Sequence, residues 1–157
     1  MARKNKKTVI NAIRLERYAA EGKSIAHLED GKTLFVEGAV PGDIAEVLVL
    51  KNKKSYAEGK AMKVIEPSPD RVIPFCEHFG ICGGCKWQML PYEKQLEYKQ
   101  IQVNDQLTRI GHIDLPPIAT IAGSELQRNY RNKLEFTFSE LSYLTREEIE
   151  AAGTEEI

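Results

Sequence analysis

The chain of 157 residues lacks a long apolar run, a secretory signal, and any internal repeat or low-complexity tract. A membrane-spanning helix needs about 20 mostly apolar residues in succession, and no stretch of the sequence approaches that length. The basic N-terminus is not followed by the apolar segment that a secretory signal requires. From these absences we expect a cytoplasmic protein without a membrane partner. Separately, we expect a monomer, although the sequence does not determine the oligomeric state. Its length predicts one or two modest domains.

Cysteine is scarce, and all three cysteines fall between positions 76 and 85. Cys76, Cys82 and Cys85 are spaced as C-x5-C-x2-C, and a C-x2-C pair lets one short loop present two sulfurs to one metal centre. Gly83 and Gly84 would let that loop curl. Three thiols cannot pair completely as disulfides, so the pattern favours a metal or catalytic site in a reducing compartment. The alternative is three small buried side chains.

Charge is balanced overall but unevenly distributed. Residues 1–75 carry 14 Lys and Arg against 10 Asp and Glu, whereas residues 140–157 carry 1 against 6. Basic side chains gather in the tail at 1–7 and again at Lys51, Lys53 and Lys54, a pattern typical of surfaces that contact phosphate. A solvated tail and a solvated hairpin tip explain these two groups equally well.

Residues 8–66 alternate short apolar runs with turn residues, which is typical of strands. Val9, Ile13 and Leu15 are expected on one face of a first strand. The Asp30-Gly31 pair predicts a hairpin. Later strands are expected at 24–28, 33–36, 44–50 and 60–65. Five short strands predict a small closed β-barrel of the OB type, a fold that commonly binds single-stranded nucleic acid through a strand face and its loops.

Two prolines within 66–70 end the strands and predict a linker over 67–75. Farther along, Pro91 and Gly111 bracket apolar residues at helical spacing, which predicts an amphipathic helix of about 19 residues. Pro91 is expected at its first position and Gly111 at its C-terminal cap. We expect the apolar stripe to pack in the core.

Alternation of Leu134, Phe136 and Phe138 with polar residues predicts a half-buried strand near the end of the second domain. We therefore expect an α+β fold: a basic tail (1–7), a barrel (8–66), a linker (67–75), a cysteine-rich domain (76–139) and an acidic continuation (140–157).

The order of these features resembles the N-terminal part of the 23S ribosomal RNA uracil-5-methyltransferases that carry a TRAM domain. The resemblance extends from residue 8 to about 139. Its most specific residues are the block Cys76–Gln88 with Tyr92, Gln95, Leu96 and Lys99. Tyr-Arg-Asn-Lys at 130–133 and an aromatic strand follow in the same order. It implies that residues 8–66 form an RNA-binding TRAM barrel. It also implies that Cys76, Cys82 and Cys85 hold a 4Fe-4S cluster.

The chain departs from that family pattern because the fourth cysteine ligand of the cluster is missing before Ile157. An alternative is a zinc site of the Cys3His type completed by His78, since this donor set is known for structural zinc. Iron-sulfur is favoured for an intact protein. For the isolated chain, iron-sulfur, zinc and no metal all stay open.

The second departure from the family pattern concerns catalysis. In the family, a C-terminal Rossmann-like domain binds S-adenosylmethionine, and a separate cysteine adds to C6 of the uracil so that C5 can attack the methyl group. The sequence has no glycine-rich cofactor loop after a strand and no spare cysteine. We therefore expect no catalytic residue and no cofactor-binding residue for S-adenosylmethionine here, and a chain that binds RNA without methylating it.

The resemblance also places residues 128–133 beside the RNA path. Arg128, Arg131 and Lys133 are then expected to contact phosphates, and Tyr130 to stack on a base. The alternative is that Tyr130 is a core residue and the cations are ordinary surface groups. Phe79 and Trp87 are expected to shield the metal from water.

Together these features predict the RNA-binding and iron-sulfur portion of an S-adenosylmethionine-dependent enzyme that forms 5-methyluridine, with 23S ribosomal RNA as the expected partner. A hypothesis from a different class is a stand-alone RNA-binding module with a structural zinc site and no activity. A third, a small electron-transfer protein, is disfavoured because the cysteines are too few.

Overall fold

The computed structural model describes residues 8–81 and 83–130, together with residues 133, 138, 140, 148 and 151. The chain divides into two compact units, 1–123 and 124–157. The strand predicted around 134–138 lies outside the described residues, except that Phe138 is almost fully exposed. The domain bounds predicted from the sequence stay predictions.

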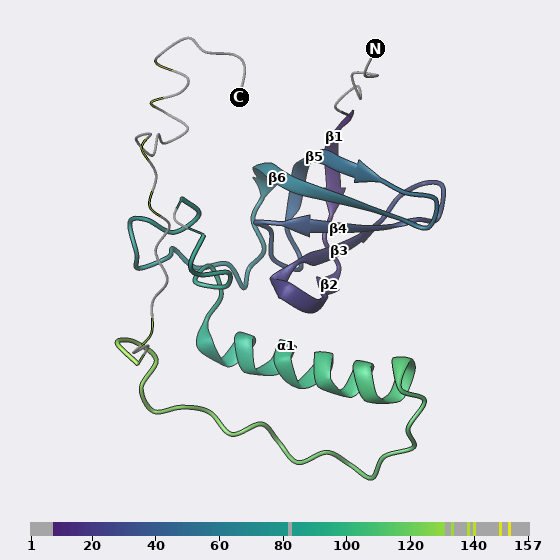
Figure 1. Cartoon of the computed structure of the whole chain (residues 1–157), viewed down its shortest axis with the longest axis vertical. Coiled ribbons are helices and arrows are strands. Elements are labelled where there is room, and N and C mark those ends of the chain that lie inside the picture. Colours follow the sequence, from purple (N-terminus) through teal and green to yellow (C-terminus); the bar gives the residue numbers. More distant parts are fainter. Residues whose placement is uncertain are drawn as a thin grey trace. The chain divides into compact units, whose positions relative to one another are not determined.

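Six strands form one sheet in the first unit (Figure 1). They are β1 (Thr8–Arg14), β2 (Arg17–Tyr18), β3 (Ser24–His27), β4 (Thr33–Glu37), β5 (Ile44–Asn52) and β6 (Tyr56–Glu66). Their order across the sheet is β1-β5-β6-β4-β3-β2. All neighbours are antiparallel except β4 and β6, which run parallel. The short strand β2 was not expected from the sequence.

The prediction of a closed five-stranded barrel was wrong, because the sheet has six strands and is open. Its two edges, β1 and β2, are separated along the chain only by Leu15 and Glu16, and no ladder joins them within the described residues. The chain changes partner at this point. The Leu15 N–H donates to the Asp43 carbonyl (2.9 Å), whereas the Glu16 N–H donates to the Ile25 carbonyl (2.7 Å). The first strand is thus divided between β5 and β3, and the sheet curls without closing.

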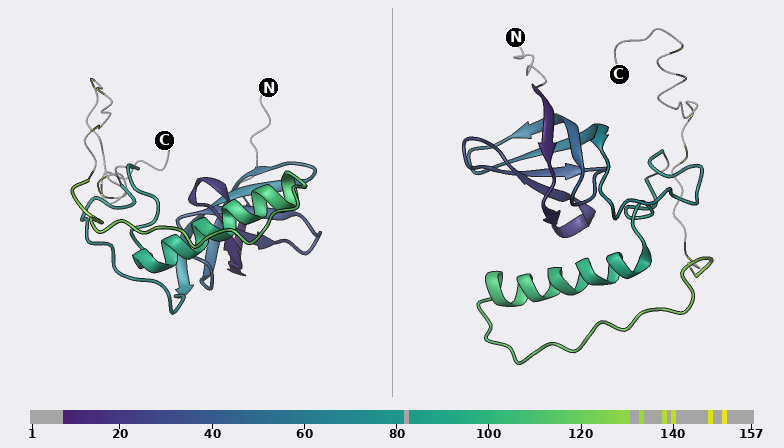
Figure 2. Two further views of the ribbon diagram at one scale, coloured as in Figure 1. Left: turned by 90° about the horizontal axis from the view of Figure 1, so that it is seen from below. Right: turned by 180° about the vertical axis from the view of Figure 1, so that it is seen from behind.

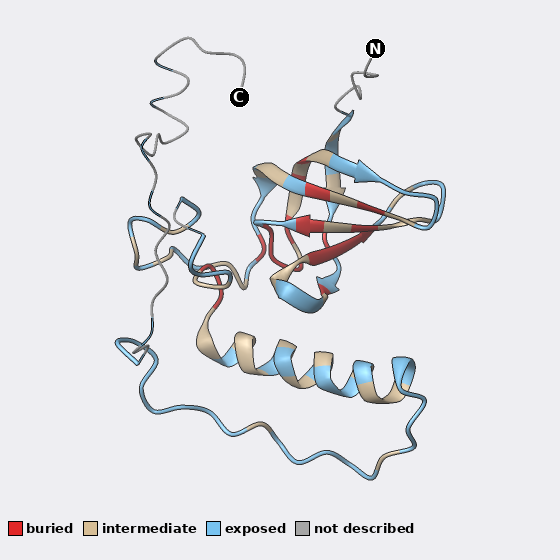
Figure 3. Cartoon of the chain, in the orientation of Figure 1, coloured by how far each residue is buried: buried red, intermediate tan, exposed pale blue. Residues whose placement is uncertain are grey.

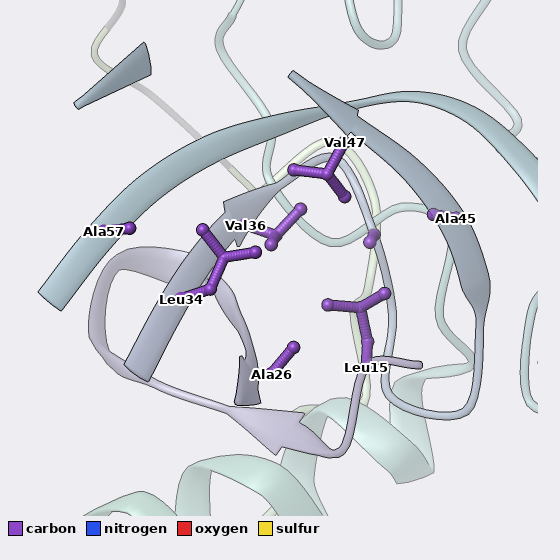
Figure 4. Close-up of a cluster of buried hydrophobic side chains, with 8 residues drawn as sticks. Leu15, Ala26, Leu34, Val36, Ala45, Val47 and Ala57 are labelled. Atoms are coloured by element: carbon purple, nitrogen blue, oxygen red, sulfur yellow. The ribbon is translucent and has the colours of Figure 1, made fainter. Parts of the chain in front are cut away.

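The core lies on one face of this curled sheet (Figures 3 and 4). Its buried members come from most of the strands and their connections: Leu15, Ala26, Leu34, Val36, Ala39, Ala45, Val47 and Ala57. Strand β4 shows the alternation most simply, since its second and fourth residues are buried while the residue between them points to the other face. Burial of each such Leu or Val contributes about 1.5–3 kcal/mol.

The prediction that Val9, Ile13 and Leu15 share one face of the first strand was wrong for Val9. Val9 is 48% exposed, whereas Ile10 and Ile13 pack against the core. The ladder between β1 and β5 shifts register between Ile10 and Ile13. Such a bulge breaks the two-residue period, so alternation counted from Val9 assigns the wrong face.

The predicted Asp30-Gly31 hairpin is present between β3 and β4. Gly31 has φ 81°, in the left-handed region, and its N–H donates to the Leu28 carbonyl at 2.9 Å. The Asp30 carboxylate accepts from the Lys32 N–H at 3.2 Å. This turn chemistry depends on adjacent residues only, which is why the sequence predicts it well.

The segment after β6 is held to the sheet by one buried carboxylate. Asp43 is fully buried, and it accepts from the Val40 N–H (2.8 Å), the Ser68 N–H (2.8 Å) and the Arg71 side chain. The two prolines of 66–70 therefore flank a buried serine that is fixed to the sheet.

Helix α1 (Tyr92–Asp105) continues into a π-helical turn at Gln106–Ile110, so the predicted 92–110 segment is helical throughout. The predicted caps were wrong. Pro91 precedes the first helical residue with ψ 150°, and Gly111 keeps a right-handed φ of −76°, while His112 takes the positive φ. No helix in the described residues is both long and apolar enough to cross a membrane.

The expectation that the helix stripe packs in the core was also wrong in large part. No residue of α1 is buried, and Val103 and Ile110 are 46% and 76% exposed. An extended segment runs beside the helix instead (Figures 1 and 2). The Gln100 side chain fastens it, donating to the Ala119 carbonyl at 3.0 Å and accepting from the Ile121 N–H at 2.6 Å.

Candidate nucleic-acid interface and cysteine loop

The three predicted hairpin lysines lie at the β5–β6 turn and are exposed. Lys51 is the last residue but one of β5, while Lys53 and Lys54 form the tip. The tip is closed by the Lys53 N–H, which donates to the Tyr56 carbonyl at 2.8 Å. This geometry projects the lysine side chains from a regular, backbone-anchored hairpin, as a phosphate-contacting loop would require.

Glu58 organises part of this basic region. Its carboxylate lies 3.1 Å from the Lys51 Nζ and 4.0 Å from the Lys23 Nζ. The hydrogen bond from Lys51 lowers the pKa of Glu58, and the charges of Lys23, Lys51 and Lys53 lower it further. The same hydrogen bond raises the pKa of Lys51. Because these groups are at the surface, the pairs contribute little to stability, but they fix where the cations lie.

An aromatic pair accompanies these charges on the face of the sheet opposite the core. The rings of Phe35 on β4 and Tyr56 on β6 meet at 73°, with their centroids 6.1 Å apart. In the β4–β6 ladder Thr33 pairs with Tyr56 and Phe35 pairs with Glu58. Sequence reasoning missed this pair. The alternation in β4 indicates that Phe35 faces away from the core, but only the pairing of β4 with β6 brings Tyr56 beside it.

Two of the three predicted metal ligands in the cysteine loop, residues 76–85, are among the described residues. Cys76 is half-buried, Cys85 is exposed, both are free thiols, and Cys82 lies outside the described residues. The Cys76 N–H donates to the Gln88 Oε1 at 3.2 Å. Gly83 has φ 71° with no atom within 4 Å of the position of an added Cβ, so this turn has open space beside it.

The donor chemistry of this loop fits a thiolate-bound metal centre, because two uncommitted thiols flank an open turn. The described residues contain no group of three His, Cys, Asp or Glu side chains arranged around a common point. His78, considered as a zinc ligand, is an exposed loop residue whose carbonyl accepts from the Ile81 N–H at 3.1 Å. The ligand set Cys76, Cys82 and Cys85 therefore stays a prediction.

Apolar contacts fix the cysteine loop to the sheet. Trp87 packs against Tyr18 with ring centroids 5.0 Å apart, and Phe79 joins the same cluster beside Val40, Met89 and Leu90. Burial raises the pKa of the Tyr18 hydroxyl. The Gln95 side chain donates to the carbonyls of Trp87 and Leu90, at 3.2 and 3.0 Å, where the loop enters α1. These contacts are observed, while the predicted shielding of a metal by Phe79 and Trp87 stays a prediction.

A recess of about 540 Å³ opens beside Trp87. Lys86 and Lys99 contribute positive charge to its lining, and Glu21 and Glu37 contribute negative charge. Because these charges offset one another, the recess selects neither an anion nor a cation.

The remaining predicted RNA contacts belong to the second unit. Tyr130 is 72% exposed, so its ring is not a core residue within that unit. Arg128 and Lys133 are exposed as well, and Arg131 lies outside the described residues. The phosphate and base contacts of these residues stay predictions.

The amino-acid sequence of this chain is similar to one domain family and to several known proteins. Residues 12–62, which cover most of the sheet, match the TRAM domain family. The chain is 53% identical over 131 residues to an uncharacterized RNA methyltransferase of Bacteroides thetaiotaomicron, and 46% identical over 132 residues to one of Porphyromonas gingivalis. It is 37% identical over 128 residues to the 23S rRNA (uracil(1939)-C(5))-methyltransferase RlmD of Nitrosococcus oceani.

These matches cover most of this chain but little of each relative. They include 83%, 84% and 79% of the chain, and 29%, 28% and 28% of the respective relatives. The chain thus spans less than a third of the length of the curated relatives that it matches. It contains a TRAM domain at residues 12–62 and is homologous to part of proteins that are named RNA methyltransferases.

Proposed function

We propose that this chain is the RNA-binding and iron-sulfur portion of an S-adenosylmethionine-dependent methyltransferase that forms 5-methyluridine in 23S ribosomal RNA. The observation that carries the proposal is the TRAM domain at 12–62 within a chain that is 37–53% identical to RNA methyltransferases. The uracil-C5 and ribosomal specificity is supported by the name of the Nitrosococcus relative.

The contribution of the first unit to this function is RNA binding. Lys51, Lys53 and Lys54 lie exposed on a hairpin of the TRAM domain, where their ammonium groups can bind phosphates in place of solvent ions or, for Lys51, in place of Glu58. In the second unit, Arg128, Arg131 and Lys133 would add phosphate contacts, and Tyr130 would stack on a base. These assignments rest on charge, exposure and resemblance.

The cysteine loop would hold a 4Fe-4S cluster through Cys76, Cys82 and Cys85, with a fourth ligand from outside this chain. Thiolates are the usual ligands of such clusters. When bound, the cluster would be structural, because methyl transfer to uracil involves no net redox change. The residues of the chain would support it: Gln88 holds the Cys76 backbone, and Trp87 fixes the loop to the sheet through Tyr18.

Methyl transfer itself would be carried out by groups outside this chain. We assign no catalytic residue and no S-adenosylmethionine contact to residues 1–157. The role of this chain is to hold RNA in a defined orientation, so that a uracil is presented to a nucleophile and a methyl donor supplied elsewhere.

The test is methyl transfer by the complete protein that contains these residues. Incubated with S-adenosylmethionine and protein-free 23S ribosomal RNA, it should produce 5-methyluridine, measured by mass spectrometry of the nucleosides. The isolated chain, assayed in parallel, should bind the same RNA and leave it unmodified. Modification of transfer RNA alone would contradict the ribosomal assignment, and methylation at another base would contradict the uracil assignment.

A further inference from the structure

We propose that the outer face of β4 and β6 is a binding site for single-stranded RNA, in which a base stacks on the Phe35–Tyr56 pair and Lys23 and Lys51 bind the adjoining phosphates. This stacking face is defined by Phe35, Tyr56, Glu58, Lys23 and Lys51. The inference rests on the proposed RNA-binding function and adds to it a position on the sheet and a class of RNA.

The placement of the two rings follows from the strand alternation. Leu34 and Val36 on β4 and Ala57 on β6 belong to the core, so Phe35 and Tyr56 project from the opposite face. Both rings are half-buried. Their edge-to-face arrangement, at 73°, means that the ring whose edge points at its partner keeps both of its own faces clear of that partner. One ring of the pair thus has faces that its partner does not cover, and both side chains are partly exposed, as stacking of a nucleobase requires.

The cations around the rings complement a nucleic-acid backbone. Phe35 on β4 pairs with Glu58 on β6, and Glu58 pairs with Lys51 on β5. Lys51 therefore lies two strands across the sheet from Phe35. Lys23 approaches from the turn before β3, 4.0 Å from Glu58 and 3.5 Å from Glu21. Glu37, two residues after Phe35 on β4, is a third acid near Lys51. With Lys53 and Lys54 at the neighbouring hairpin tip, four lysines face these three acids.

The combination favours single-stranded over double-stranded RNA. A base in a duplex has both faces stacked on its neighbours and cannot reach an aromatic side chain, whereas an unpaired base can be splayed onto one. Lysines alone would bind either form. The aromatic pair is thus the feature that distinguishes the two forms of RNA.

The test compares Phe35→Leu and Tyr56→Leu with the unaltered chain. Leucine retains apolar volume but removes the ring, and circular dichroism establishes that each variant is folded. Fluorescence anisotropy would be measured with a labelled 12-nucleotide oligouridylate and with a duplex RNA of equal length. We expect each variant to bind the oligouridylate about 5- to 150-fold more weakly, the range expected when one base no longer stacks. Binding to the duplex should change less than twofold.

Two control variants separate the failure of this inference from the failure of the proposed function. Ile65→Ala removes an exposed apolar side chain from the far end of β6 and should leave RNA binding unchanged. Lys51→Ala combined with Lys53→Ala and Lys54→Ala should weaken binding to both RNAs. If this triple variant weakens binding while the two leucine variants do not, the stacking face is overturned and RNA binding stands. If the unaltered chain binds neither RNA, both are overturned.

A second measurement covers the case in which a leucine variant does not fold. In the unaltered chain, titration with the oligouridylate should move the ring-proton NMR signals of Phe35 and Tyr56 upfield, because a stacked base shields them. Saturation with RNA without any shift of these signals would overturn the inference.

Discussion

Asp43 and Arg71, 28 positions apart in the sequence, form an ion pair that joins the start of β5 to the segment after β6. The Arg71 Nε lies 3.1 Å from the Asp43 Oδ1, and the guanidinium also donates to Oδ2. Asp43 is fully buried and its two oxygens also accept the N–H groups of Val40 and Ser68. One carboxylate thus satisfies four donors that would otherwise be left unpaired.

Asp43→Ala should therefore be among the most destabilising single substitutions in the TRAM domain. Removing the carboxylate leaves the buried N–H groups of Val40 and Ser68 without an acceptor, at a cost of about 1–3 kcal/mol each, and leaves Arg71 without its counter-charge. Urea unfolding monitored by circular dichroism measures this. Arg71→Ala should cost less, because the arginine side chain is partly exposed and its removal leaves Asp43 with two backbone donors. Equal effects of the two substitutions would contradict this account.

Gly22→Ala should be more destabilising than Gly31→Ala. Both glycines have positive φ, at 72° and 81°, so alanine introduces backbone strain of about 1 kcal/mol at either position. An added Cβ at Gly22 would lie 2.6 Å from the Trp87 Nε1, whereas at Gly31 nothing lies within 4 Å. The difference between the two free energies of unfolding isolates the packing of Trp87 on this turn. Equal destabilisation would show that Trp87 moves away without cost.

Replacing Lys51, Lys53 and Lys54 by alanine should flatten the salt dependence of RNA binding. Each phosphate that the variant no longer neutralises lowers the slope of log Kd against log salt by about 0.7 for a single strand. Anisotropy titrations at four or five salt concentrations measure it. Lys63→Ala, which changes a lysine farther along β6, is the matched control. An unchanged slope in the triple variant would remove this hairpin from the interface.

Glu58→Gln should strengthen RNA binding severalfold at low salt. The carboxylate holds Lys51 and Lys23 in the free chain, and its charge repels an approaching phosphate. The gain should shrink as salt increases, because ions in the surrounding solvent screen charges at the surface. Weaker binding by the Gln variant would mean that Glu58 instead positions the lysines for RNA.

The same residue gives a pH dependence of defined sign. The pKa of Glu58 is lower in the folded chain than its ordinary value of 4.5, so its ionised form favours folding. That contribution is present above pH about 4.5 and disappears as the pH falls through the folded-state pKa. Thermal unfolding between pH 6 and 3 should therefore show a slightly smaller acid destabilisation in Glu58→Gln than in the unaltered chain. Identical profiles would show that Glu58 makes no net contribution.

Cys82→Ser should abolish metal binding and leave the sheet folded. Purified without oxygen, the complete protein that contains these residues should show a broad violet absorption band with iron and sulfide in similar amounts, and its Cys82→Ser variant should show neither. Gly84→Ala is a control that changes the same loop without removing a thiol. Zinc in place of iron would favour the structural-zinc alternative, and unchanged metal content in Cys82→Ser would contradict the ligand assignment.

Features that depend on neighbouring residues were predicted well from the sequence. The Asp30-Gly31 turn, the positions of β3, β4 and β5, and the helical segment 92–110 all follow from local backbone preferences and from the period of apolar side chains. The cysteine spacing and the residues around it indicated the family that the comparisons support. These signals are local because φ and ψ preferences and hydrophobic alternation act over a few residues.

The tertiary structure alone decided which strands are neighbours and whether the sheet closes. The bulge in β1, the division of the first strand at Leu15 and the parallel pairing of β4 with β6 bring together segments far apart in the chain. The Phe35–Tyr56 pair exists only because β4 lies beside β6, and the Asp43–Arg71 ion pair exists only because the end of β6 lies beside the start of β5. The sequence does not predict these contacts because the register between distant strands is set by how the whole core packs, and no local preference encodes that register.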